Sequence, residues 1–287
     1  MAINYDHVMG LREILDIRYT ERDTMLYALS VGFGRAFTAP QELSFVFEKG
    51  GLKAAPTMVC VLTRGVRIME ESGVDMTMTV HGGQRIELFA ELPPAGALTS
   101  TRRVKAVIDK GEGRGAILVI EALLTDKEGR RLAATTSTVF CRADGGFGGP
   151  NDGTPVRHPL PEGPPDLVLP DLVLEIGTRP EQALLYRLTG DYNPIHADPA
   201  LAARAGFALP VLHGLCTYGM VGRLLLHHCC DYDVALFRAM DARFASPVYP
   251  GETLVTEIWG KGRTRAFRTS VKERNKVVLD NGLAEFN

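Results

Sequence analysis

The chain has 287 residues, of which 45% are hydrophobic and 23% are charged, and its formal net charge is −2. This composition is typical of a globular protein with one large or two ordinary domains. No run of about 18 apolar residues occurs, so we expect no membrane-spanning helix. Basic residues form no stripe along the chain, which argues against a nucleic-acid-binding protein.

The N-terminal residues and the cysteines favour a cytoplasmic protein. Residues 1–12 lack the apolar segment of a secretory signal. The five cysteines are odd in number and their spacing fits no zinc-binding pattern, so we expect buried, reduced thiols.

The first half of the chain begins with a helix signal. Thr20 and Asp23 fit a capping box, in which a hydroxyl and an acid three residues later satisfy free N–H groups at a helix start. Residues 50–80 contain several glycines and a proline, so a central helix in this region should be short or absent. Strands are predicted at residues 104–108, 116–124 and 133–141.

A segment rich in glycine and proline divides the chain. Residues 145–165 read GGFGGPNDGTPVRHPLPEGPP, a composition that forms neither a helix nor a central strand. We interpret this segment as a linker between an N-terminal unit, residues 1–144, and a C-terminal unit, residues 166–287.

The second unit repeats features of the first. Thr178 and Glu181 repeat the capping-box pattern, and a Leu-Tyr pair follows the pattern at the same distance in both units. A Phe-Ala pair followed by glycine, at Phe89 and Phe244, recurs with equal spacing. Strands are again predicted in the second unit, at residues 254–259, 266–271 and 277–284.

One helix, residues 213–230, is expected to be long. Gly219 and Gly222 each cost about 1 kcal/mol relative to alanine in a helix, so close approach of a neighbour, most simply a sheet, should offset that cost. A long helix wrapped by an antiparallel sheet is the hot-dog arrangement. We therefore predict an α+β double hot-dog fold with two antiparallel sheets and a long central helix in the C-terminal unit.

Residues suited to activating water lie in an irregular part of the C-terminal unit. Asp191 and His196 are five residues apart, a spacing that a regular helix or strand would turn to different sides. Gly190 and Asn193-Pro194 predict a turn that can bring the two side chains together. A carboxylate and an imidazole can then polarise one water molecule. The alternative is an Asx turn at Asp191 and a surface histidine.

The repeat favours the functional interpretation. Gly32 and Phe37 occupy the equivalent positions in the N-terminal unit, so one working and one vestigial site is the simplest account. His213-Gly214 opens the long helix, where free N–H groups and the helix dipole suit an oxyanion. The alternative for this pair is an ordinary helix start.

These motifs resemble the MaoC-like, (R)-specific enoyl-CoA hydratases, including the hydratase 2 unit of peroxisomal multifunctional enzymes type 2. The resemblance covers nearly the whole chain. One departure is Gly83, which stands where relatives often carry an acid. The matching segments are Leu185–His196, Leu212–Gly219 and Arg243–Gly251, with shorter matches at 80–82, 92–93 and 145–149.

The resemblance implies an active site and a reaction. Asp191 and His196 would be catalytic, Asn193 would support them, and Gly214 would donate to the oxyanion. The substrate would be a trans-2-enoyl-CoA of fatty-acid or sterol side-chain β-oxidation, and the product a (3R)-3-hydroxyacyl-CoA. Independently of the resemblance, the short or absent central helix of the N-terminal unit is expected to leave room for a long acyl chain. No metal or cofactor is needed, because the thioester itself accepts the electrons.

Other functions and partners remain open at this stage. A hot-dog acyl-CoA thioesterase, a non-catalytic acyl-CoA-binding module and a dehydratase acting on acyl-carrier protein are the alternatives. Lys261, Arg263 and Arg265 are candidates for the CoA phosphates, and a solvated strand end is their alternative interpretation. By resemblance, two chains are expected to form a homodimer.

Overall fold

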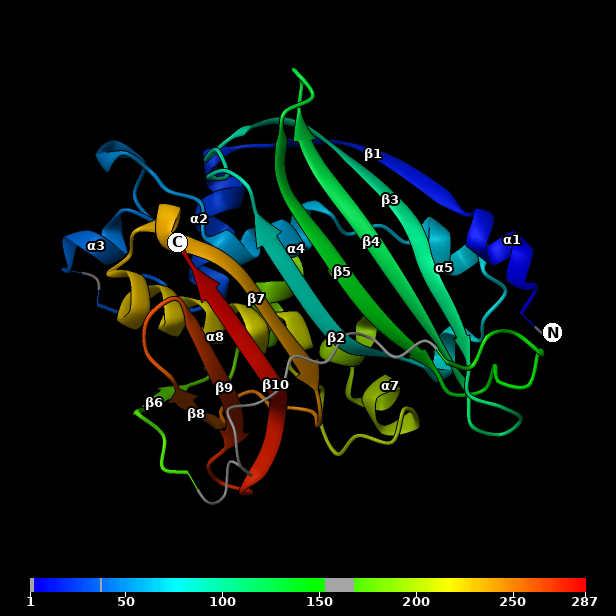
Figure 1. Cartoon of the computed structure of the whole chain (residues 1–287). Coiled ribbons are helices and arrows are strands. Elements are labelled where there is room, and N and C mark those ends of the chain that lie inside the picture. Colours follow the sequence, from blue (N-terminus) through cyan, green and yellow to red (C-terminus); the bar gives the residue numbers. More distant parts are fainter. Residues whose placement is uncertain (1–2, 37, 153–167) are drawn as a thin grey trace.

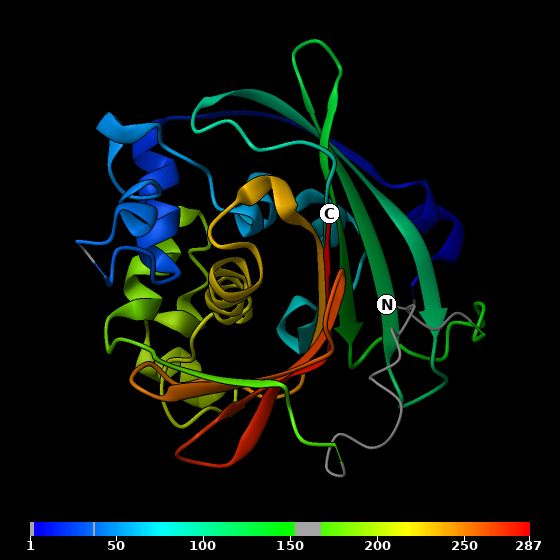
Figure 2. The same ribbon diagram turned by 60° about the vertical axis from the view of Figure 1, so that its left-hand side comes forward.

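The computed structural model describes residues 3–36, 38–152 and 168–287. One ten-stranded antiparallel sheet curves around a group of helices (Figures 1 and 2). The strands are β1 (Arg12–Tyr19), β2 (Thr79–Leu88), β3 (Gly96–Asp109), β4 (Ala116–Asp126), β5 (Arg131–Cys141), β6 (Leu172–Gly177), β7 (Phe237–Phe244), β8 (Thr253–Trp259), β9 (Thr264–Val271) and β10 (Lys276–Phe286).

The strand order shows the internal repeat directly. From the two outer edges inward, the order is β1-β3-β4-β5-β2 in one unit and β6-β8-β9-β10-β7 in the other. Each unit therefore places its first strand at an edge and its second strand at the junction. Strands β2 and β7 pair with Gly83 opposite Arg243, which joins the two sheets we predicted into one. All six predicted strands are confirmed, whereas β1, β2, β6 and β7 were not predicted.

The helices vary greatly in length. They are α1 (Tyr5–Gly10), α2 (Glu21–Ser30), α3 (Pro40–Leu43), α4 (Val59–Leu62), α5 (Arg67–Glu71), α6 (Gln182–Tyr186), α7 (Pro199–Arg204) and α8 (Gly214–Cys230). The long helix predicted from residue 213 is confirmed as α8, with His213 as its N-cap. Figure 2 shows α8 almost end-on, in yellow, inside the curve of the sheet. In the described part of the chain, no helix is long and apolar enough to cross a membrane.

The glycines of α8 allow close packing, but mainly against the N-terminal unit rather than the sheet. A Cβ atom at Gly219 would lie 2.6 Å from Val31, which follows α2, and one at Gly222 would lie 2.5 Å from Thr57. Met240 of β7 is farther from Gly222, at 3.5 Å. The predicted close neighbour therefore exists, but the prediction that it is the sheet was wrong.

The N-terminal unit has no counterpart of α8 within its described residues. A 3₁₀ turn at Pro56–Met58 lies against α8, the four-residue helix α4 follows this turn directly, and a glycine precedes α5. The expectation of a short central helix is confirmed.

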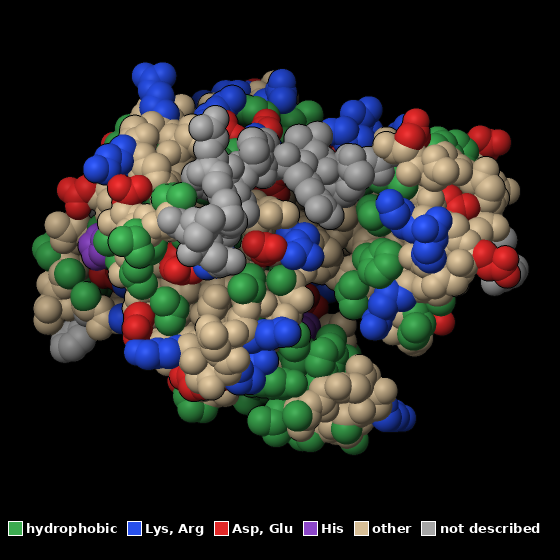
Figure 3. Space-filling view, turned by 60° about the horizontal axis from the view of Figure 1, so that its bottom comes forward, with side chains coloured by type: hydrophobic (Ala, Val, Ile, Leu, Met, Phe, Trp, Pro, Cys, Tyr) green, Lys and Arg blue, Asp and Glu red, His purple; other side chains and the backbone are tan. Residues whose placement is uncertain are grey.

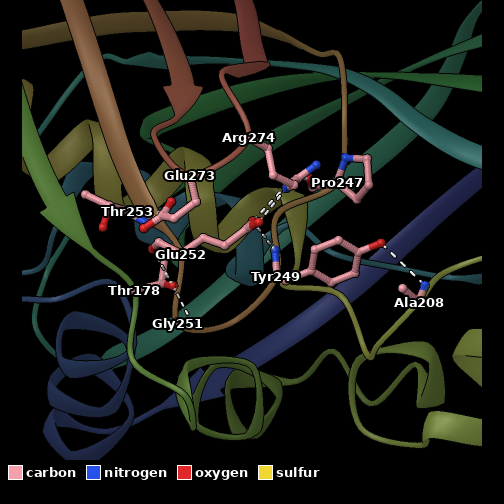
Figure 4. A network of polar contacts seen from close by, with 9 residues as sticks. All are labelled: Thr178, Ala208, Pro247, Tyr249, Gly251, Glu252, Thr253, Glu273 and Arg274. Carbon is pink, nitrogen blue, oxygen red and sulfur yellow. Dashed lines mark hydrogen bonds and ion pairs between the residues drawn. The ribbon is translucent and has the colours of Figure 1, made fainter.

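One of the two predicted capping boxes forms. At the start of α2, the Asp23 carboxylate accepts hydrogen bonds from the backbone N–H and the hydroxyl of Thr20, both at 2.8 Å. Thr178 does not cap a helix, because its hydroxyl donates to the Glu252 carbonyl and accepts from the Gly251 N–H (Figure 4).

Candidate active site

The segment that carries Asp191 and His196 is a sequence of tight turns. Gly190 has a φ of +117°, in the left-handed region that favours glycine, and it ends the 3₁₀ turn Arg187–Thr189. The Asn193 side chain accepts a hydrogen bond from the Ile195 N–H at 3.2 Å and caps the next 3₁₀ turn, Pro194–His196. Asn193 therefore shapes the backbone that presents His196, and its own side chain is exposed.

The hydrogen bonds of His196 determine which ring nitrogen can act as a base. Its Nδ1 lies 2.7 Å from the Val211 carbonyl, which can only accept, so Nδ1 carries the proton. In the neutral ring, Nε2 is then free to accept a proton. Asp191, His196 and His213 each bring one potential ligand atom to within 4.8 Å of the others. This spacing suits a water molecule held between the carboxylate and the imidazole.

His213 contacts both Asp191 and His196. It is buried, its ring stacks on that of His196 with centroids 3.6 Å apart, and its Nε2 donates to the Asp191 carbonyl at 3.1 Å. Burial and then the neighbouring His196 lower the pKa of His213 to about 4. Burial also lowers the pKa of His196. Both imidazoles are therefore neutral at pH 7, as a general base requires.

Arg64 binds the acid of the site from the other unit. It follows α4 and donates to the Gly190 carbonyl and to Oδ1 of Asp191, both at 2.9 Å. The same Oδ1 accepts from the Asn193 N–H at 3.3 Å, so the Asx turn given above as the alternative for Asp191 also forms. With Oδ1 engaged twice, Oδ2 is the oxygen available to a water molecule.

The three clustered residues also form a potential metal-binding group by distance alone. The guanidinium of Arg64 lies at hydrogen-bond distance from the carboxylate, and a fixed positive charge there disfavours a second cation. One nitrogen of each histidine is already committed to a backbone carbonyl. The group is better arranged for a neutral water molecule than for a metal ion.

The start of α8 faces the same space. Gly214 is exposed and lines a cavity together with Asp191 and His196. The first N–H groups of a helix have no partner within the helix and are suited to an oxyanion. The absence of a side chain at Gly214 also has a packing cause, because a Cβ atom would lie 3.1 Å from the Phe244 ring.

The cavity at the site is large, about 2340 Å³. It continues past the ends of β2 and β7 onto the outer face of the N-terminal sheet, where Arg103 and Glu121 line it. Figure 3 shows a hollow on this side of the molecule with Lys and Arg side chains around it. Arg204 of α7 and Arg243 of β7 are among its basic lining residues.

The basic residues singled out for CoA do not line this cavity. Lys261, Arg263 and Arg265 lie at the turn between β8 and β9 and at the start of β9. Arg265 interacts electrostatically with Cys229, near the C-terminal end of α8, whereas Asp191 and His196 lie near its N-terminal end. Lys261 lies 3.7 Å from Asp171, and Arg265 donates to backbone carbonyls of its own turn. These contacts agree with the alternative of a solvated strand end.

Sequence reasoning missed two contributors to the site. Arg64 is 127 residues from Asp191 in the chain, and no local pattern marks it. The sequence marks His213 only as a helix start, whereas in the structure it contacts both Asp191 and His196. In the N-terminal copy, Gly32 occupies the position equivalent to Asp191 with a φ of +94°, and Phe37 lies outside the described residues.

Comparison with known proteins identifies the two units separately. The family model "MFE-2 hydratase 2 N-terminal domain" matches residues 17–143, and the model "MaoC like domain" matches residues 164–281. The gap between the two matches, residues 144–163, overlaps most of the glycine- and proline-rich segment. Residues 153–167 of this region lie outside those that the structure describes.

Relatives match over the full length. The 3-hydroxyacyl-thioester dehydratase Y of Mycobacterium tuberculosis is 38% identical, covering 100% of this chain and 99% of that protein. The peroxisomal enoyl-CoA hydratase 2 of Arabidopsis thaliana is 37% identical over 91% of this chain and 88% of its own length. The crystal structure of a MaoC-like dehydratase from Phytophthora capsici, 31% identical, covers 99% of this chain and 98% of its own, with a TM-score of 0.86.

Proposed function

Because the chain belongs to the MaoC-like enoyl-CoA hydratase 2 family, we propose that it adds water to trans-2-enoyl-CoA to give (3R)-3-hydroxyacyl-CoA. The observation that carries this proposal is the convergence of the Asp191 carboxylate and the free Nε2 of His196 on one open space. The N-terminal end of α8 borders that space, so one site supplies a base, a second water ligand and an oxyanion donor.

The geometry suggests how the oxygen of the water reaches the β-carbon and how one of its protons reaches the α-carbon. Oδ2 of Asp191 and Nε2 of His196 hold the water, and neutral His196 takes one of its protons as the oxygen bonds to the β-carbon. The electron pair of the double bond moves toward the thioester oxygen, where the Gly214 N–H stabilises the developing charge. The imidazolium then gives its proton to the α-carbon, so the complete water molecule is added.

The test is loss of the enoyl absorbance in wild type and in two isosteric variants. Asp191→Asn and His196→Gln are each expected to lower turnover by about 10²- to 10⁴-fold, the usual contribution of acid–base catalysis. Circular dichroism and thermal unfolding establish that both variants fold. Turnover within a few fold of wild type in either variant would remove that residue from the mechanism.

The same site can catalyse the reverse reaction, dehydration, or act on an acyl-carrier-protein thioester in place of a CoA thioester. The dehydratase name of the Mycobacterium tuberculosis relative describes the reverse reaction, and a common transition state serves both directions. Comparing CoA and acyl-carrier-protein thioesters distinguishes the two carriers. Release of free CoA thiol would instead reveal a thioesterase, and binding without any loss of enoyl absorbance a non-catalytic module.

Other parts of the proposal concern the CoA moiety and the assembly. Arg204 and Arg243 line the cavity and are better placed for the CoA phosphates than the turn between β8 and β9. We also propose a homodimer in the cytoplasm, whereas several relatives are peroxisomal by name. Light scattering measures the oligomeric state, and cell fractionation measures the location in the cell.

A further inference from the structure

The residues that precede α8 lie next to both the proposed base and the proposed oxyanion donor. Residues 211–213 run directly into Gly214, the first residue of α8. The Val211 carbonyl lies 2.7 Å from Nδ1 of His196, and the Val211 N–H donates to the Ile195 carbonyl at 3.3 Å. One short segment therefore holds the base and begins the helix whose N-terminal end borders the site.

The side chain of His213 connects this segment to both Asp191 and His196. Its ring is 2% exposed and stacks on the His196 ring, with an angle of 23° between the two ring planes. Its Nε2 lies 3.1 Å from the Asp191 carbonyl, which can only accept, so Nε2 carries the proton. The buried ring of Tyr186 also packs against His213, with centroids 4.8 Å apart. The position of His213 is therefore fixed by packing as well as by hydrogen bonding.

The two stacked histidines carry their protons on different nitrogens. His196 is protonated at Nδ1 and presents Nε2, whereas His213 is protonated at Nε2. The Nδ1 of His213 is buried and has no hydrogen-bond partner among the described residues. A second proton on this ring would create a buried charge beside His196, so burial and then His196 lower the pKa of His213 to about 4. The ring stacked on His196 is therefore uncharged when His196 takes a proton from water.

The internal repeat associates His213 with the proposed pair rather than with the scaffold. The alignment of the two units that places Gly32 opposite Asp191 also places Ala54 opposite His213. The tyrosine of the Leu-Tyr pair, in contrast, is present in both units and fully buried in each. The unit without the carboxylate is therefore also the unit without the histidine, although a core residue that both units need has been kept.

From these contacts we propose that His213 is a positioning residue, whose ring orients His196 and whose N–H holds the backbone of Asp191, so that both groups meet one water molecule. The inference rests on the proposed function, because it names what aligns the reacting groups of that site. Arg64 binds the Asp191 carboxylate from the N-terminal unit, and His213 holds the same residue from the C-terminal unit. A misplacement of about 1 Å can slow a reaction by about 100-fold, so loss of either contact of His213 should lower kcat.

Two variants separate the two contacts of His213 in the hydration of 2-decenoyl-CoA. His213→Phe keeps an aromatic ring against His196 but loses the N–H to Asp191, whereas His213→Gln keeps a donor and loses the ring. Each should lower kcat by roughly tenfold or more and change KM by less than about threefold. Burial is the main cause of the low pKa of His196, which Asp191 raises and Arg64 lowers. Because glutamine lets water reach that ring, His213→Gln should move the acidic limb of kcat to higher pH, and His213→Phe should leave it in place.

A double variant distinguishes positioning from a general loss of structure. Asp191→Asn lacks the carboxylate that the N–H of His213 is proposed to align, so adding His213→Phe to it should lower kcat by less than about twofold. His228→Phe changes an exposed histidine near the other end of α8 and should leave kcat, KM and the acidic limb unchanged. A full tenfold loss in the double variant, or a wild-type kcat in His213→Phe, overturns the inference while the hydratase activity stands. Failure of the wild type to hydrate the substrate instead refutes the proposed function.

A measurement on the wild-type protein decides the inference even if a variant fails to fold. In NMR spectra of the protein labelled with ¹⁵N-histidine, neutral His213 should carry its proton at Nε2 and neutral His196 at Nδ1 at pH 7. These opposite tautomers are what the hydrogen bonds to the Asp191 and Val211 carbonyls require. A neutral His213 with its proton at Nδ1 could not donate to Asp191, and this result overturns the inference.

Discussion

Replacing Arg64 with glutamine tests whether the N-terminal unit takes part in catalysis. The change removes the hydrogen bonds to the Gly190 carbonyl and to Oδ1 of Asp191, both 2.9 Å long. Hydrogen bonds to charged groups contribute about 1.5–3 kcal/mol. Because the Arg64 side chain is 34% exposed, water screens the pair and the lower value applies. A loss of about 1.5 kcal/mol corresponds to roughly tenfold in kcat/KM.

The pH profile separates a positioning role from a merely structural one. Burial is the main cause of the low pKa of His196, and the positive charge of Arg64 lowers this pKa further, while Asp191 raises it. His213, stacked on the same ring, is neutral at the relevant pH. Removing the Arg64 charge therefore raises the pKa of His196. Since neutral His196 is the proposed base, the acidic limb of kcat should move to higher pH.

Two further variants complete this test. Arg64→Lys keeps the charge but not the planar fork, so the acidic limb should stay near its wild-type position while turnover still falls. Arg67→Gln removes an exposed arginine of the same segment, paired with Glu71 on α5, and should change neither quantity. A normal rate and an unmoved acidic limb in Arg64→Gln would refute the reasoning.

Three predictions concern stability. Gly222→Ala should lower the free energy of unfolding, measured by urea titration, by about 1 kcal/mol, because overpacking against Thr57 exceeds the gain in helix propensity. A second change, Thr57→Ser, should recover most of this loss. If Gly222→Ala alone stabilises the protein, the close packing against Thr57 is contradicted. Glu42→Gln leaves the buried guanidinium of Arg223 without its countercharge and should lower the free energy of unfolding by about 3–5 kcal/mol. The double change Glu42→Leu/Arg223→Met should lower it by less. Equal losses in the two variants would argue against the buried ion pair. The pKa of His213 is about 4 in the folded protein and about 6.5 in the unfolded chain, so the unfolded chain binds more protons between these pH values. The free energy of unfolding should therefore fall as the pH is lowered from about 6.5 to 4. His213→Asn should weaken this pH dependence, and an unchanged slope would contradict the assignment.

Features encoded in neighbouring residues could be predicted from the sequence. Runs of β-branched and apolar residues marked β4 and β9, and apolar residues throughout residues 213–230 marked α8. The turn between Asp191 and His196 followed from Gly190 and Asn193-Pro194, whose backbone preferences are local. The comparison of the two units then indicated which polar residues were not required by the scaffold.

Features that depend on distant segments could not be predicted. β2 contains two consecutive glycines and β7 carries several charges, so neither has strong strand propensity, yet they pair at the centre of the sheet. Tertiary pairing overrides such weak local preferences. Thr178 matches a capping box in sequence, but its hydroxyl instead forms hydrogen bonds with the loop that ends at Glu252. Arg64 belongs to the same class, since only folding brings it to Asp191.

The network around Glu252 shows how the C-terminal unit fixes the other side of the cavity (Figure 4). The Glu252 carboxylate accepts from Arg274 and from the Tyr249 N–H, and Arg274 also donates to the Pro247 carbonyl. The loop held in this way presents the Val248 carbonyl, which accepts from the Leu212 N–H immediately before His213. The start of α8 is thus held by its own sheet through this loop.

The two units therefore contribute to one site in different ways. The C-terminal unit supplies Asp191 and His196 and holds the helix start, and the N-terminal unit supplies Arg64, the partner of the Asp191 carboxylate. It also covers the glycine face of α8 through Val31 and Thr57. A duplicated unit that had merely lost its catalytic pair would be expected to keep its central helix. Here the helix is short, and Arg64 follows it and reaches Asp191, so the feature that distinguishes the N-terminal unit from the other is also the one that carries its arginine to the shared site.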